Sequence, residues 1–198
     1  MQKVIDAFEA AMARAEHLGG VQAALVALTT KALDTSDILR AQIVLGVSAF
    51  DFYLHEITVL GMLEVWLGKR QPTDAYSKFK VSMAALSGSN GASSVWFEAE
   101  IRERHSFLSF QQPDKVADAI RLFSTVQLWR EVALRMRRSE ADVKNDLRLI
   151  VDRRNKIAHE ADLNPSFPDL CWPISESDVV GALTFLKAAT RTIHSVVV

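Results

Sequence analysis

The chain is poor in cysteine, and its N-terminal segment is not expected to be an export signal. Its single cysteine, Cys171, excludes an internal disulfide and a zinc site built from cysteines. Acids at Asp6, Glu9 and Glu16 interrupt the N-terminal segment, which therefore lacks the apolar core of a secretory signal peptide. Both features are typical of the reducing cytoplasm, and we expect that location. No glycine-rich phosphate loop or metal-ligand spacing is found, so we expect neither a cofactor nor a metal.

Chain-breaking residues are scarce as well. Eight glycines and five prolines among 198 residues leave long segments rich in Ala, Leu, Arg, Lys and Glu, which favour helix. No segment shows sustained alternation of apolar and polar residues, so we place no strands. The sequence therefore predicts one all-α domain, 1–198, folded as an up-and-down bundle of four to five long helices with shorter extra helices.

Neither an excess of positive charge nor an uninterrupted apolar run is present. The 23 basic and 24 acidic residues give a net charge of -1, so any nucleic-acid-binding surface has to be local. The most apolar stretch, 41–67, contains Asp51, Glu56 and Glu64, and carboxylates are costly to bury in lipid. We expect this stretch to form a buried central helix and expect no membrane association.

Capping residues, glycines and prolines divide the chain into segments. We expect helices at about 3–18 and 21–33, with Gly19-Gly20 between them, and then at 37–69, 74–86, 94–108, 113–137, 140–160 and 175–197. Ser139 and Ser175 are expected to cap the last two helices. The stretch 87–91 is predicted to be the most flexible loop, and 164–173 a proline-containing loop.

The segment 140–160 carries the most informative pattern. With a rotation of about 100° per residue, an apolar stripe forms from one set of positions (Val143, Leu147, Ile150, Ile157 and Ala161). Arg154 falls in the middle of that stripe, and Asn155 and His159 share the adjoining face, one turn apart. A guanidinium among apolar residues needs a partner. Two interpretations stay open: an intramolecular ion pair, for example with Asp51 or Glu56, or a phosphate site in which histidine carries protons.

The string Arg153-Arg154-Asn155-Lys156-Ile157-Ala158-His159 resembles the motif of the HEPN superfamily, in which an arginine and a polar residue precede a histidine. Arg154, Asn155 and His159 match it position by position. The stretch 42–57 is similar to the long early helix of the family, and the RiboL-PSP type is the most similar subfamily. The resemblance covers 37–69 and 139–197, whereas 74–138 is a possible elaboration.

The resemblance implies a metal-independent endoribonuclease that acts in the cytoplasm as a homodimer, with a composite active site made by two motifs. It implies that the ribose 2′-hydroxyl attacks the neighbouring phosphate, while His159 moves protons and Arg154 holds the developing charge. Asn155 would orient either the histidine or the scissile phosphate. It also implies a defence or toxin–antitoxin setting with an antitoxin or other partner protein. The alternative is a non-catalytic HEPN-like module that binds RNA, a nucleotide or a partner. A purely structural dimerisation module would leave the motif unexplained.

Weaker candidates accompany the motif. Between positions 130 and 156, nine basic residues face five acidic ones, which favours either an anionic partner or a solvated surface. Phe167 and Trp172 could stack on bases or cover the end of the bundle. Asp51 and His55 are expected to form a hydrogen-bonded pair rather than a metal site, and His105 to lie at the surface or its boundary.

Overall fold

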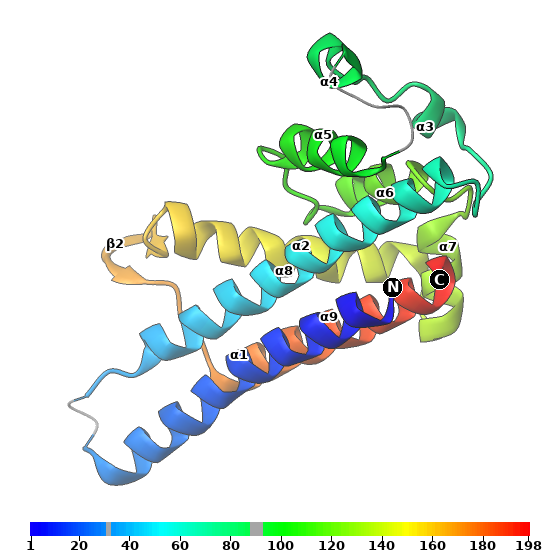
Figure 1. Cartoon of the computed structure of the whole chain (residues 1–198). Helices are drawn as coiled ribbons and strands as arrows, with labels where there is room; N and C mark the ends of the chain where they lie inside the picture. The colour runs from blue at the N-terminus through cyan, green and yellow to red at the C-terminus, as the bar shows by residue number, and fades with distance from the viewer. Residues whose placement is uncertain (31–32, 88–92) are drawn as a thin grey trace.

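Four long helices form the body of the protein. The computed structural model describes residues 1–30, 33–87 and 93–198. The long helices are α1 (Gln2–Leu28), α2 (Ser36–Trp66), α8 (Glu140–His159) and α9 (Glu176–Val197). They lie alongside one another, consecutive ones run in opposite directions, and the two chain ends meet at one end of the bundle (Figure 1). The prediction of an all-α, up-and-down bundle is confirmed.

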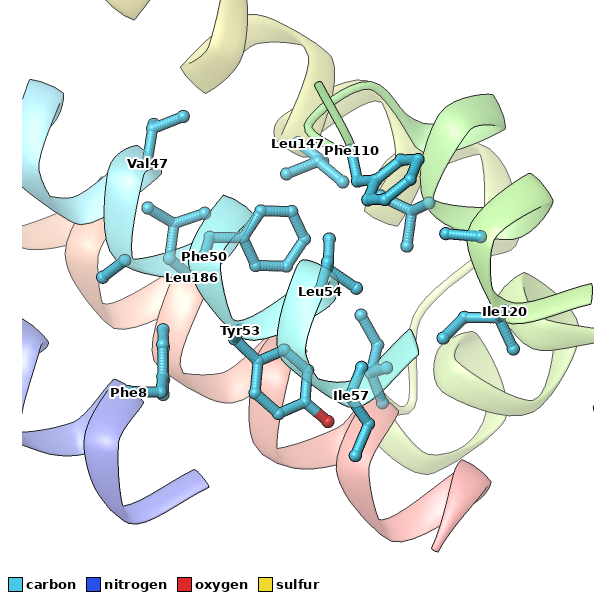
Figure 2. Close-up of a cluster of buried hydrophobic side chains, with 14 of the residues drawn as sticks. Phe8, Val47, Phe50, Tyr53, Leu54, Ile57, Phe110, Ile120, Leu147 and Leu186 are labelled. Atoms are coloured by element: carbon cyan, nitrogen blue, oxygen red, sulfur yellow. The ribbon is translucent and has the colours of Figure 1, made fainter. Parts of the chain in front are cut away.

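Helix α2 is the centre of the core, as its apolar composition predicts. It packs against α1, α8, α9 and the shorter α5 (Val95–His105) and α6 (Pro113–Arg121). Phe50, Tyr53, Leu54 and Ile57 of α2 are completely buried among apolar side chains of these neighbours (Figure 2). By length and composition alone α2 could also cross a membrane, but 56% of its most apolar window is buried in the protein. A core helix of a globular fold has the same properties.

Helix α1 runs without a break through Gly19-Gly20, so the predicted stop between 18 and 21 is wrong. A glycine inside a helix costs about 1 kcal/mol relative to alanine, which made the pair look like a boundary. The packing of α1 on α2 offsets this cost. A Cβ on Gly19 would lie 3.0 Å from Oε1 of Gln42, so glycine lets the two helices approach closely.

Two predicted helices are each divided in two. The segment 74–86 forms α3 (Asp74–Ser77) and α4 (Met83–Ser87), and 113–137 forms α6 and α7 (Leu128–Met136). The second break allows Phe123, which is 2% exposed, to pack directly on Gly61 of α2. This contact is tertiary, and helix propensity does not reveal it. The predicted loop at 87–91 lies almost wholly outside the described residues.

The loop after α8 contains a small hairpin, so the prediction of no strands is wrong. Strands β1 (Leu163–Asn164) and β2 (Phe167–Cys171) pair antiparallel. They are too short to show an alternating pattern. The two serine caps are confirmed: Ser139 accepts a hydrogen bond from the Asp142 amide at the start of α8, and Ser175 and Asp178 form a reciprocal capping box at the start of α9.

Candidate functional site

The predicted motif occupies the last two turns of α8. Three apolar residues of this helix, Val143, Leu147 and Val151, are buried in the core. The last turns rise out of the core: residues 153–157 are half-buried and 158–160 are exposed. The predicted apolar stripe is therefore buried only in its first half. Ala161 is exposed and lies beyond the helix in a left-handed conformation, so its assignment to the buried stripe is wrong.

Arg154 forms no ion pair within the described part of the chain. Its Nη1 donates a hydrogen bond to Oδ1 of Asn155 at 3.0 Å, and its Nε is buried without a hydrogen-bond partner. Of the two interpretations, the intramolecular ion pair with Asp51 or Glu56 is not found, because both acids are engaged elsewhere. Asp51 accepts from the Phe110 amide and from Gln111, and Glu56 pairs with Arg102.

A half-buried guanidinium without a carboxylate is stabilised by an anionic partner. His159, the last residue of α8, is exposed, and it makes no hydrogen bond or ion pair inside the described ranges. It follows Asn155 by one helical turn, so the two share one face of the helix. Asn155 thus lies between an unpaired cation, to which it is bonded, and an accessible imidazole. This set can bind an oxyanion and exchange protons with a bound molecule.

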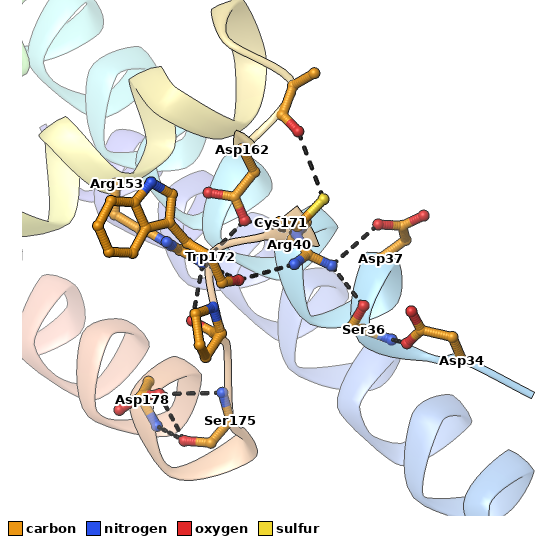
Figure 3. Close-up of polar contacts among 12 residues, drawn as sticks. Asp34, Ser36, Asp37, Arg40, Arg153, Asp162, Cys171, Trp172, Ser175 and Asp178 are labelled. Carbon is orange, nitrogen blue, oxygen red and sulfur yellow. Dashed lines mark hydrogen bonds and ion pairs between the residues drawn. The ribbon is translucent and has the colours of Figure 1, made fainter. Parts of the chain in front are cut away.

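The neighbouring Arg153 points into a different environment. Its Nη2 donates to Oδ2 of Asp162 at 2.9 Å, and to the carbonyl oxygens of Trp172 and Pro173 at 3.1 Å each. Nε of Arg40, from α2, reaches the same Oδ2 at 2.7 Å (Figure 3). We name Arg40, Arg153 and Asp162 the Asp162 cluster.

The Asp162 cluster is almost free of solvent at its centre. Asp162 is 1% exposed and Arg40 is 8% exposed. Burial lowers the pKa of Arg40, but the hydrogen bond and charge of Asp162 outweigh this effect, so the pKa is raised overall. No sequence pattern reveals this cluster. In the sequence Arg40 already has an acid one turn away, Asp37, with which it pairs at 3.2 Å, and nothing in the order of residues links it to Asp162, 122 positions away.

The hairpin aromatics have different surroundings. Lys156 Nζ lies 4.9 Å from the ring centroid of Trp172, which is half-buried against the end of α8. Phe167 is 60% exposed, so of the two rings only that of Trp172 packs on the bundle.

The basic residues between positions 130 and 156 are less available to an anionic partner than their number indicates. Several of them are tied down: Arg138 to Asp146, Lys144 to Asp114 and Glu140, and Arg153 to Asp162.

His55 and His105 do not extend the site. His55 Nε2 lies 3.8 Å from Oδ1 of Asp51, which is close enough for an ion pair but too far for the predicted hydrogen bond. No group of three metal-ligating side chains is found in the portion of the chain that the structure describes. His105 is buried, so its predicted place at the surface is wrong. Burial and the charge of His55 lower its pKa to about 4.

An apolar face of α2 lies open beside the end of α8. Leu45 and Phe52, two turns apart on this face, are 43% and 47% exposed. A depression of about 530 Å³ is lined by Val44 and Leu45 of α2 and by Ile157 of α8, which places this face next to the motif. Exposed apolar side chains on one helix face can contribute to a contact surface between proteins.

Comparisons with known proteins add no assignment. No protein-family model, no curated protein and no solved structure matches this chain. The arrangement of the residues is therefore the basis for a functional hypothesis.

Proposed function

We propose that this chain is a metal-independent endoribonuclease of the HEPN type. The observation that carries the proposal is the unpaired guanidinium of Arg154, which is half-buried and bonded to Asn155. Asn155 in turn lies one helical turn before the exposed His159. A phosphodiester supplies the anion that Arg154 lacks. The order of residue types is also that of the motif which the sequence resembles.

In the proposed reaction the ribose 2′-hydroxyl attacks the adjacent phosphorus and the bond to the 5′ oxygen breaks. The attacking hydroxyl loses a proton and the leaving oxygen gains one, and histidine is suited to both transfers near neutral pH. Arg154 donates to the phosphate oxygens as negative charge develops on them. The products are a 2′,3′-cyclic phosphate and a 5′-hydroxyl.

We propose further that two copies of the chain assemble with their α8 ends facing each other. Leu45 and Phe52 would supply the contact, since they form the open apolar face beside the motif. A two-fold axis there brings both copies of Arg154 and His159 to one composite site. A cytoplasmic role in defence or as the toxin of a toxin–antitoxin pair fits such an enzyme and is part of the proposal.

The test is incubation of the purified protein with total RNA in EDTA. Wild type should produce fragments that end in a 2′,3′-cyclic phosphate. His159→Ala should lose a factor of about 10²–10⁴ in rate, which is the usual contribution of a general acid or base. The matched control is His17→Ala, because His17 is another exposed histidine, on α1, far from α8 in sequence. Cleavage that vanishes with EDTA and returns with Mg²⁺ would overturn the mechanism.

The double variant Arg154→Ala with His159→Ala should be little slower than the slower single variant, because groups that act in one step are not additive. The alternative function is a HEPN-like module that only binds RNA, a nucleotide or a partner. It is supported if wild type never cleaves while Arg154→Ala alone abolishes RNA binding. If all variants bind and cleave RNA as wild type does, Arg154 and His159 have no part in the function.

A further inference from the structure

Asp162 connects three parts of the chain that are distant in sequence. Its side chain accepts from Arg40 of α2 and from Arg153 of α8. Its backbone carbonyl accepts from the Trp172 amide at 2.8 Å, which closes the base of the hairpin. Arg40 and Arg153 in turn both donate to the carbonyl oxygen of Trp172, at 3.0 and 3.1 Å (Figure 3). The end of α8, the start of α2 and the hairpin are thus joined at one buried point.

The backbone around Asp162 also ends α8. Ala161 and Asp162 have φ values of 52° and 56°, a left-handed conformation that residues with a Cβ adopt rarely. This conformation brings the amide of Asp162 to the carbonyl oxygen of Lys156 at 3.0 Å, which also accepts the helical hydrogen bond of the Glu160 amide. Two successive residues keep it only if tertiary contacts hold them there. The buried ion pairs of Asp162 are such contacts.

We infer that Arg153 and Asp162, with Arg40, are positioning residues for His159, an inference that rests on the proposed nuclease function. His159 lies in the last turn of α8, three residues before Asp162, and helix ends open locally at low cost in free energy. The Asp162 cluster fixes this last turn and so keeps the imidazole one turn from Asn155. The two adjacent arginines therefore have separate tasks: Arg154 contacts the phosphate and Arg153 holds the helix end.

The inference is tested with Arg153→Met and Asp162→Asn, which remove one cation and the central charge with little change in shape. Arg153→Lys is the conservative variant, since its ammonium can donate to the same acceptors over a shorter reach. The matched control is Arg70→Met. Arg70 likewise joins a carboxylate, Glu64, to a backbone carbonyl, that of Val197, but at the opposite end of α2.

The first readout does not depend on catalysis. The imidazole signals of His159 in NMR spectra should broaden or shift in Arg153→Met and Asp162→Asn, and the amides of Glu160 and Asp162 should exchange with solvent faster than in wild type. Arg70→Met should leave these signals unchanged. If the His159 signals and the amide exchange of the cluster variants match those of wild type, the inference is wrong, whether or not the protein cleaves RNA.

The second readout is cleavage, measured below the melting temperature of every variant. Arg153→Met should lower kcat roughly 10- to 100-fold, because a displacement of about 1 Å at a reacting group has an effect of that size. KM should stay near the wild-type value, since Arg154 is intact, and Arg153→Lys should recover part of kcat. A kcat loss of the same size in Arg70→Met would mean that the Asp162 cluster contributes only to general stability and does not position His159. No cleavage by wild type refutes the proposed function, and the NMR readout still decides the role of the cluster.

Discussion

Mild acid should destabilise this protein through one buried imidazole. His105, the last residue of α5, is 4% exposed, and its Nδ1 has no hydrogen-bond partner among the residues that the structure describes. The rings of Phe79, Phe110 and His55 lie around it, with centroids 5.8, 5.2 and 6.4 Å away. Burial, reinforced by the charge of His55, lowers the pKa of His105 from 6.5 to about 4.

The direction of the pH effect follows from these two pKa values. Between about pH 6.5 and about pH 4 the unfolded chain binds a proton at this imidazole and the folded chain does not. The free energy of unfolding is therefore highest above about pH 6.5 and falls as the pH approaches 4. A pKa difference of roughly 2.5, at about 1.4 kcal/mol per unit, corresponds to a loss of about 3 kcal/mol.

The assay is urea unfolding followed by circular dichroism, at several values between about pH 7 and about pH 4.5, for wild type and His105→Phe. The variant keeps a ring in the pocket but removes the titration. His194, whose pKa burial also lowers, contributes equally to both proteins. Burial raises the pKa of Glu100, but hydrogen bonds from Ser82 and Arg104 lower it overall, and hydrogen bonds from Ser175 lower the pKa of Asp178. Both carboxylates lose stabilisation chiefly at lower pH. The reasoning is refuted if the two proteins lose stability in parallel across this range.

Three further expectations concern packing, charge and assembly. Gly61→Ala should lower the free energy of unfolding by about 1–3 kcal/mol, because the new Cβ would lie 2.2 Å from the Phe123 ring. Gly20→Ala, with open space around the new Cβ, should raise that free energy by about 0.5–1 kcal/mol in the same urea titration. Arg154→Met should leave the free energy of unfolding within about 0.5 kcal/mol of wild type while weakening RNA binding in a filter assay. A large loss of stability would mean that Arg154 has a partner within the protein. Phe52→Asp should give a folded monomer by light scattering, and an unchanged dimer would move the contact surface elsewhere.

The local signals of the sequence were enough for the starts of α8 and α9 and for the place of the motif on α8. Serine caps at 139 and 175 began α8 and α9 where predicted, because a cap bonds to amides two or three residues away. The rotation of about 100° per residue likewise put Asn155 and His159 on one face of α8. Interactions within one or two helical turns depend on neighbouring residues alone, so they can be derived from the order of residues.

Contacts between distant segments decided the rest. The glycine pair at 19–20 stayed helical because α2 packs on it, and the predicted helix 113–137 broke because Phe123 turns into the core at Gly61. The tasks of Arg153 and Arg154 could not be told apart in the sequence, where they are adjacent residues of one type. The acid that engages Arg153 is itself held by Arg40, 122 positions away along the chain. Only folding brings such groups together, since burial of the whole core determines which side chains meet.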